Sequence, residues 1–457
     1  MTSSNNIVPP APANLYRAPR VRREVLSPFV LSSASQTHGP AEGRLPTFLG
    51  FLTAVYLVSV ATLSSAVLEA SWIPQVVGVV LGVCWLVVGL FIKGQEIRWV
   101  WPISLYLLFA VWAVTGLFVT AELTFFTMLI TTLAKVAGVT WICLQCVQTR
   151  RDVLFCYFLL GFASLIVLYQ GIDAIVHSIE FAGEKGAKDV RAGTTLLANA
   201  NDLGEFGVIT LVGVTACVMG YKNTFVRVVS LGFGVAALYI IAASGSRTAM
   251  LGTVTFATAL YFFHFRNAGA ASAGRRVLLV FLSLFLVAAS AYFVAKLPFF
   301  YRLQEVFSSR ENLEKEPRVE YFFRAIESTA QHPVFGLGLG GFAMARLGVG
   351  AGGKGHYSHS TVSETLSCTG IPGFLLYYGA QFAFFRILQR TRRLPLPKPD
   401  KTMVNIIMAH FWVYLFFSTV VSMDSHRLAW PLVGGLLGYV WSLNKRYAAA
   451  SPSYATA

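Results

Sequence analysis

The stretch WIPQVVGVVLGVCWLVVGLFI, residues 72–92, contains no charged side chain. A helix needs about 20 mainly apolar residues to cross the hydrocarbon core of a bilayer. Comparable blocks recur along the 457-residue chain, which is 55% hydrophobic and only 12% charged. Soluble domains carry roughly 25% charged residues. The sequence therefore predicts an all-α polytopic membrane protein.

The apolar blocks predict about twelve transmembrane helices. Their approximate limits are residues 46–68, 72–92, 99–120, 123–147, 152–176, 199–219, 224–243, 247–264, 276–296, 361–387, 403–422 and 427–443. Basic side chains concentrate in alternate connections, and loops rich in Lys and Arg face the cytoplasm. These residues are Arg17, Arg20, Arg22, Arg23, Arg44, Lys93, Arg98, Arg150, Arg151, Lys222, Arg266, Arg275, Arg276, Arg386, Arg390, Arg392, Arg393, Lys398, Lys401, Lys445 and Arg446. Both termini are therefore predicted to be cytoplasmic.

Three regions follow from this pattern. Residues 1–45 are rich in Pro, Ser, Ala and Arg, lack a long apolar run, and are predicted to be a disordered cytoplasmic tail rather than a signal peptide. Residues 46–445 form the membrane domain, and residues 446–457 a second cytoplasmic tail. Within the membrane domain, residues 297–360 are predicted to be a large periplasmic loop, a length that usually indicates function.

Composition excludes several kinds of partner. The net charge of +15 would suggest nucleic acid in a soluble chain, but in a membrane protein its distribution sets orientation, so no nucleic-acid partner is expected. Of the six cysteines, all except Cys368 fall in apolar blocks. Cys143 and Cys146 are spaced like metal or redox ligands, but they lie inside a predicted span without a second pair. No metal site, cofactor or disulfide is therefore expected.

The stretch HPVFGLGLGGF, residues 332–342, places Gly336, Gly338 and Gly341 at the spacing of a dinucleotide fingerprint. That fingerprint requires a preceding strand in a cytosolic domain. Here the glycines lie in the predicted external loop and no strand precedes them. We expect instead a tight turn that lets the backbone pass close to a glycan or to a helix end.

An amphipathic helix is predicted from Pro317 to just before Pro333, lying on the outer mouth of the bundle. Its apolar stripe comprises Val319, Phe322, Phe323, Ile326 and Ala330.

The two arginines of this helix differ in their neighbours. Arg324 has Glu320 and Glu327 at ion-pair spacing, whereas Arg318 has no acidic helical partner and lies in the first turn, where the helix dipole disfavours a cation. Arg318 is therefore either a solvated side chain or a ligand for an anion, which we favour.

Arg247 has the same unusual position. In ASGSRTAM, residues 243–250, Gly245 can end one helix, Ser246 can cap the next, and Arg247 opens it at the predicted outer rim of the membrane. The alternative is a side chain that reaches to lipid headgroups. A bound phosphate would satisfy both the guanidinium and the helix N-terminus.

His359 is the third candidate. Thr361 and Glu364 have capping-box spacing, so a helix should begin near Thr361 and place His359 at the membrane face. A metal site with His356 lacks a third ligand, and a plain surface histidine is an alternative. Close to two arginines that bind an anion, His359 would serve as a general base or a phosphate ligand.

Four further polar residues belong to the same hypothesis or to its alternatives. Lys135 falls in the middle of a span and should face a polar cavity, together with the arginines. Asp424, in the short loop SMDSHR (residues 422–427), could orient a base or pair with Arg427. Asp202 and Glu205 open the sixth span, where acids near a helix N-terminus are explained by the dipole.

Several of these stretches resemble the O-antigen ligase and O-antigen polymerase superfamily. They are GSRTAM (245–250), RVEYFFRAIESTAQHPVFGLGLGGF (318–342) and HYSHSTVSETLSCTGIPGFLLYY (356–378). LLANANDLGEF, residues 196–206, is similar to the Asn-rich segment of that family, with Asn201 as the matching asparagine and Ala200 in place of the usual proline. The predicted topology, with a large periplasmic loop between the ninth and tenth spans, is also similar. The long N-terminal tail and the glycine-rich GVGAGGKG (348–355) depart from the family.

The resemblance implies a function. Family members transfer a glycan from an undecaprenyl-diphosphate carrier to an acceptor on the periplasmic side of the inner membrane, with a C-type glycosyltransferase fold and without metal or nucleotide sugar. The resemblance also implies that Arg247, Arg318 and His359 are catalytic, and that Lys135, Asp424 and Asn201 bind substrate. The acceptor stays open: another lipid-linked repeat for a polymerase, or a lipid A-core or protein hydroxyl for a ligase.

The main alternative is a secondary transporter or a lipid-linked glycan flippase. About twelve spans with internal charges would suit it. Against it, the two halves show no matching pair of interrupted segments.

Overall fold

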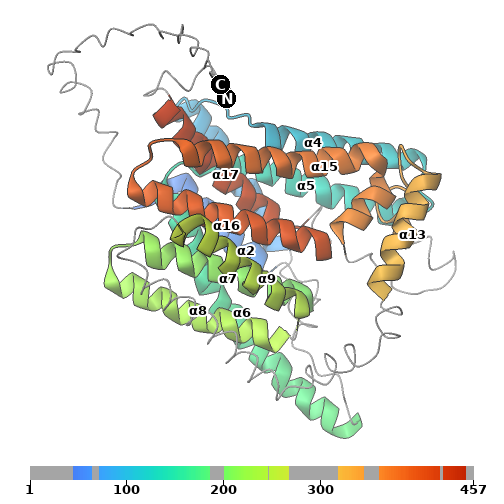
Figure 1. Ribbon diagram of the computed structural model, residues 1–457, viewed down its shortest axis with the longest axis horizontal. Helices are drawn as coiled ribbons and strands as arrows, with labels where there is room; N and C mark the ends of the chain where they lie inside the picture. The colour runs from blue at the N-terminus through green and yellow to red at the C-terminus, as the bar shows by residue number, and fades with distance from the viewer. Residues whose placement is uncertain are drawn as a thin grey trace, which may run out of the picture. The chain divides into compact units, whose positions relative to one another are not determined.

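The computed structural model describes residues 45–63, 72–185, 200–244, 246–266, 317–343, 360–421 and 426–448. For residues 170–185, 200, 317–320 and 448 only the backbone is described. In these ranges the protein is all-helical, as the sequence predicts (Figure 1). The N-terminal tail, the predicted span 276–296 and the site residues His359 and Asp424 lie outside the described residues.

The helices follow the predicted spans closely. They are α2 (Phe48–Leu63), α3 (Ile73–Cys84), η2 (Trp85–Ile92), α4 (Trp101–Val114), η3 (Thr115–Phe118), α5 (Leu123–Cys146), α6 (Arg150–Lys185), α7 (Ala200–Gly220), α8 (Thr224–Ser244), α9 (Arg247–Leu260), η4 (Tyr261–Phe265), α13 (Pro317–Gln331), α15 (Thr361–Arg393), α16 (Lys398–Val420) and α17 (Ala429–Ala448).

Nine helices of the described ranges are long and apolar enough to cross a membrane. They are Ile73–Ile92, Trp101–Phe118, Leu123–Cys146, Arg150–Tyr169, Asn201–Gly220, Thr224–Ser244, Arg247–Phe265, Thr361–Arg393 and Lys398–Val420. Two more predicted spans coincide with α2, which has 16 residues, and with α17, which has 20. The protein is a multi-pass membrane protein, and the count of twelve stays a prediction.

α7 and α16 are the two most buried of the nine candidate membrane spans. α7 packs against α6, α8, α9 and α16, while α17 packs against α5, and α15 against α4 (Figure 1). Aromatic stacking links α4 to α17, because the ring centroids of Tyr106 on α4 and Trp430 on α17 lie 3.6 Å apart. A hydrogen bond links α6 to α16, where the buried Tyr157 hydroxyl lies 2.7 Å from His410 Nδ1.

The predicted amphipathic helix is present as α13 and begins at Pro317 as expected. It contacts α15 and crosses one end of it in Figure 1. The face that it buries differs from the predicted apolar stripe. Tyr321, Ala325 and Thr329 are buried, whereas Phe322 and Phe323, both from the stripe, are exposed. Tyr321 and Ala325 form a buried cluster with Phe342 and with Cys368 of α15.

The glycine stretch after α13 is a tight turn, as predicted, and it packs against a kink in α15. Gly336, Gly338 and Gly340 have φ of 65°, 78° and 77°, and Gly370 at the kink has φ 67°. The Leu337 N–H donates to Ser367 O at 2.8 Å, on α15 just before the kink. The close approach is therefore to the backbone of α15 at this kink.

We expect Gly336→Ala to destabilise the protein. An L-residue at positive φ costs about 1–2 kcal/mol, and a methyl group here would lie 2.5 Å from the Cys368 carbonyl carbon. Thermal unfolding of the purified protein should show a clearly lower midpoint. The matched control is Gly232→Ala in α8, where nothing lies within 4 Å of the added methyl group. Equal midpoints for the two variants would contradict this account of the turn.

Candidate functional site

The turn between α8 and α9 is held against the start of α7. Ser246 is the N-cap of α9, as predicted, and its Oγ accepts the Ala249 N–H at 3.3 Å. The same hydroxyl donates to Asn201 Oδ1 at 2.8 Å. Gly204 makes this approach possible, since a Cβ there would lie 2.5 Å from the Ala249 methyl group. Asn201 thus fixes the residue that immediately precedes Arg247.

Arg247 is the first residue of α9 and its side chain is exposed. The positive end of a helix dipole disfavours a cation and favours an anion. The N-terminus of α9 therefore presents backbone N–H groups and a guanidinium together, which is the arrangement that binds phosphate.

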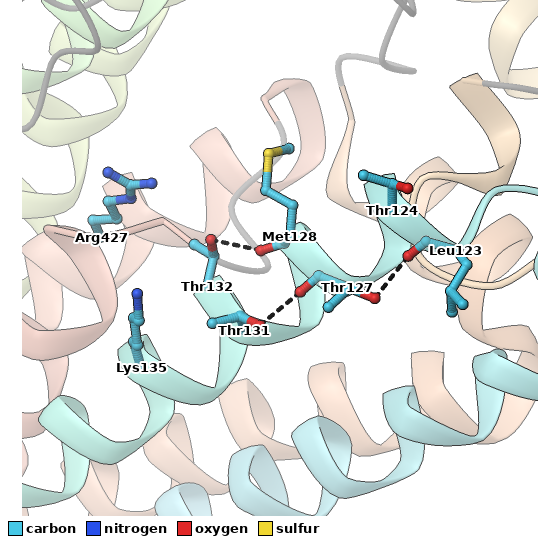
Figure 2. Close-up of a pocket in the computed structure, with 8 residues that line it drawn as sticks. All are labelled: Leu123, Thr124, Thr127, Met128, Thr131, Thr132, Lys135 and Arg427. Atoms are coloured by element: carbon cyan, nitrogen blue, oxygen red, sulfur yellow. Dashed lines mark hydrogen bonds between the residues drawn. The ribbon is translucent and has the colours of Figure 1, made fainter.

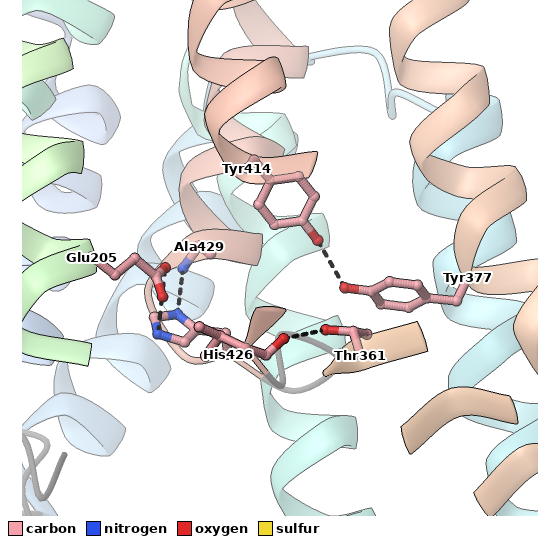
Figure 3. Close-up of polar contacts among 7 residues, drawn as sticks. Glu205, Thr361, Tyr377, Tyr414, His426 and Ala429 are labelled. Atoms are coloured by element: carbon pink, nitrogen blue, oxygen red, sulfur yellow. Dashed lines mark hydrogen bonds and ion pairs between the residues drawn. The ribbon is translucent and has the colours of Figure 1, made fainter. Parts of the chain in front are cut away.

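The starts of α15 and α17 converge with the end of α16 (Figure 3). Thr361, the first residue of α15, donates from its hydroxyl to Val421 O at 2.7 Å and from its N–H at 3.1 Å. The helix begins where the sequence predicts, but the predicted capping box does not form. Ser360 is the N-cap and accepts the Ser363 N–H. With Ser360 as the N-cap, Glu364 is the fourth helical residue rather than the third, which a capping box requires. Its carboxylate instead accepts a hydrogen bond from the Cys368 thiol.

A buried carboxyl lies between α7 and α17. Glu205 is 1% exposed, and neither carboxylate oxygen has a hydrogen-bond partner among the described residues. His426 Nε2 lies 3.7 Å from Glu205 Oε1 (Figure 3). From the sequence, Glu205 was explained as an acid favoured by the dipole near a helix N-terminus, and that explanation does not account for its burial. A carboxyl inside a predicted span is costly, and that signal could have singled out Glu205.

One hydrogen bond of His426 indicates which ring nitrogen carries the proton. Its Nδ1 accepts the Ala429 N–H at 3.2 Å, at the start of α17, so the ring proton is on Nε2 and faces Glu205. Burial, and secondly the neighbouring Arg427 guanidinium, lower the pKa of His426 from 6.5 to about 4. The ring is therefore neutral at pH 7. Sequence reasoning missed His426 because its role depends on packing against α7.

An open cavity of about 580 Å³ runs along one face of α5 (Figure 2). Its lining combines hydroxyl groups with two cations: Leu123, Thr124, Thr127, Met128, Thr131, Thr132, Lys135 and Arg427. Lys135 Nζ also donates to Gln75 Oε1 at 3.4 Å. Lys135 lines this open cavity and its side chain is exposed. In the described part of the chain, Arg427 rather than Arg247 is the arginine that lines it.

The structure describes part of the predicted site. Asn201 bonds to Ser246, the residue before Arg247, while His426 lies near Glu205 on α7 and Arg427 lines the α5 cavity. Arg318 is the second residue of α13, and only its backbone is described. His359 precedes the described Ser360, and Asp424 lies between the described Val421 and His426. Within the described residues, no group of three or more potential ligands could hold a metal ion.

The central part of the chain matches a protein family. Residues 232–378 match the family model described as O-antigen ligase. The chain carries an O-antigen ligase family domain. Arg247, Arg318 and His359 all fall within this O-antigen ligase domain, whereas Asn201, Lys135 and Asp424 lie outside it. No curated protein matches the chain.

Proposed function

We propose that the protein transfers a glycan from an undecaprenyl-diphosphate carrier to an acceptor hydroxyl at the periplasmic face of the inner membrane. The observation that carries this proposal is the position of Arg247. It lies in the O-antigen ligase domain, at the first residue of a helix whose cap is fixed by Asn201. A lipid diphosphate supplies the anion that such a position favours.

The chemistry develops negative charge on the leaving group. The acceptor oxygen forms a bond to the anomeric carbon, the bond from that carbon to the diphosphate oxygen breaks, and undecaprenyl diphosphate departs. Arg247 and Arg318 would stabilise the diphosphate with planar, two-pronged contacts. His359 would accept the proton of the acceptor hydroxyl or hold a phosphate oxygen. The arginines supply the positive charge, so the proposed mechanism needs neither metal nor cofactor.

Asn201 has a supporting role in this proposal, because it fixes the capped turn that carries Arg247. Asp424 and Lys135 are proposed to bind substrate on the strength of the family resemblance. Ligase and polymerase activities share this donor chemistry and differ in the acceptor.

The test is glycan transfer by the purified full-length protein from an undecaprenyl-diphosphate-linked glycan, with nucleotides absent and a chelator present. Extracted lipid A-core, lipid-linked repeat units and a hydroxyl-bearing peptide are offered separately as acceptors. We expect transfer to one of them. Transfer that requires an added divalent metal or a nucleotide sugar would rule out this mechanism.

We expect the site to face the periplasm. Cysteine introduced for the exposed Glu327 on α13 should react with a membrane-impermeant maleimide added to intact spheroplasts. Cysteine introduced for Asn223, in the exposed turn between α7 and α8, should react only after lysis. The reversed pattern would overturn the orientation and, with it, the periplasmic reaction.

A further inference from the structure

The connection between α16 and α17 contacts a different helix at each of its two ends (Figure 3). At one end, Val421 O accepts hydrogen bonds from the N–H and the hydroxyl of Thr361, at 3.1 and 2.7 Å. At the other end, His426 Nε2 lies 3.7 Å from Glu205 Oε1 on α7. The connection therefore bridges the first residue of α15 and the second turn of α7.

Each end of this bridge lies close in the chain to a candidate catalytic residue. Thr361 is the first residue of α15 and follows His359 by two positions. Glu205 follows Asn201 by four positions on α7, and residues four apart lie on the same face of a helix. Asn201 accepts a hydrogen bond from the residue before Arg247. The bridge thus joins the helix start beside His359 to the part of α7 that holds the Arg247 turn.

His426 performs two tasks in the bridge. Its Nδ1 accepts the N–H of Ala429, three residues ahead, which is the hydrogen bond that an N-cap side chain makes. Because Nδ1 accepts, the ring proton lies on Nε2, where it faces Glu205. One imidazole therefore caps the start of α17 and contacts α7.

The burial of Glu205 indicates that this contact has a purpose. Glu205 is 1% exposed, and among the described residues neither carboxyl oxygen has a hydrogen-bond partner. Buried polar groups in folded proteins are nearly always hydrogen-bonded, so a carboxyl in this position needs a specific explanation. The N–H of His426 is the donor that points to it.

We propose that Glu205 and His426 are positioning residues for glycan transfer. Glu205 holds the connection between α16 and α17 through His426, and the connection fixes the start of α15, beside His359, relative to Arg247. This inference rests on the proposed function and deepens it. Neither residue contacts the diphosphate or the acceptor in the proposed chemistry.

The experiment measures glycan transfer by variants of the full-length protein, with an undecaprenyl-diphosphate-linked glycan as donor. His426→Asn is the central variant. Asparagine is a good N-cap and keeps the hydrogen bond to Ala429, but it is too short to reach Glu205. Glu205→Leu removes the same contact from the other side. Both should lower the turnover number by about 10- to 100-fold, as a displaced reacting group does, and leave the KM for donor within about twofold.

Two further variants test whether the pair acts as a unit. Glu205→Gln keeps an oxygen that can accept the imidazole N–H, so it should retain most of the turnover number. The double variant Glu205→Leu, His426→Asn should be no slower than the slower single variant, because the effects of residues that act through one contact do not add.

Tyr157→Phe is the control for a loss of stability alone. The Tyr157 hydroxyl forms a buried hydrogen bond with His410 Nδ1 between α6 and α16. Its removal should lower the midpoint of thermal unfolding and leave the turnover number unchanged. A merely structural role for Glu205 and His426 would give this same pattern in their variants.

Hydrogen exchange followed by mass spectrometry provides a measurement that does not depend on transfer. The N–H of Thr361 is bonded to Val421 O, and the N–H of Ala429 is bonded to the His426 ring. In His426→Asn, the peptide that contains Thr361 should lose protection, while the peptide that contains Ala429 should keep it. Tyr157→Phe should leave both peptides protected.

Three results would overturn the proposal. One is an unchanged turnover number in both His426→Asn and Glu205→Leu. Another is a Glu205→Gln protein as slow as Glu205→Leu, and the third is unchanged exchange at Thr361 in His426→Asn. An unmodified protein that transfers no glycan would instead overturn the proposed function, and hydrogen exchange would still test the bridge.

Discussion

Arg318→Lys should lower glycan transfer by about 100-fold or more, the loss typical when one preorganised donor to a developing negative charge is removed. The substitution keeps the positive charge and removes the planar fork that contacts two phosphate oxygens at once. Arg318 is the second residue of α13, close to the positive end of the helix dipole, where a bound anion is favoured. We expect the turnover number to fall more than the affinity for donor, because the contact strengthens as the leaving group gains charge.

Arg324→Lys on the same helix is the matched control. Arg324 is exposed, six residues further along α13, and a surface ion pair contributes little. Transfer by Arg324→Lys should stay within about twofold of the unmodified protein. If the two variants lose activity equally, Arg318 has no special role at the diphosphate and the assignment fails.

His359→Ala should abolish transfer while leaving donor binding largely intact. If the imidazole accepts the proton of the acceptor hydroxyl, its removal leaves no general base at the reacting oxygen. The two arginines would still hold the diphosphate. Steady-state transfer and equilibrium binding of undecaprenyl diphosphate, measured on one preparation, separate these effects.

His332→Ala provides the comparison. His332 is exposed, in the turn after α13, and should tolerate the change. A His359→Ala protein that loses donor binding along with transfer would identify His359 as a phosphate ligand rather than a base. Unchanged transfer would exclude both roles.

The helices could be predicted because their causes are local. Uncharged blocks of membrane-spanning length, Pro317 at the first helical position and Ser246 before α9 each act within a few residues. For most spans, the predicted limits accordingly lie within a few residues of the helix ends in the structure. The N-cap of α15 was predicted wrongly, because two neighbouring side chains, Ser360 and Thr361, could both serve as the N-cap. Ser360 takes it, while Thr361 bonds to Val421 on another helix.

The tertiary parts of the site could not be predicted in the same way. Whether Glu205 lies at a solvated helix start or in the interior depends on His426, more than 200 residues away in the chain. The pairing of Lys135 with Arg427 in one cavity likewise depends on how α17 packs against α5. On α13, hydrophobicity pointed to Phe322 and Phe323, which are exposed. The buried residues are Tyr321, Ala325 and Thr329. Sequence patterns identified chemically unusual residues without identifying their neighbours.

The most direct test of the central claim is an experimental structure of the full-length protein with undecaprenyl diphosphate bound. The account predicts one diphosphate whose oxygens lie within hydrogen-bond distance, about 3 Å, of Arg247, Arg318 and His359. A diphosphate bound elsewhere, with these three side chains separated by more than about 15 Å and beyond the reach of a closing loop, would contradict it.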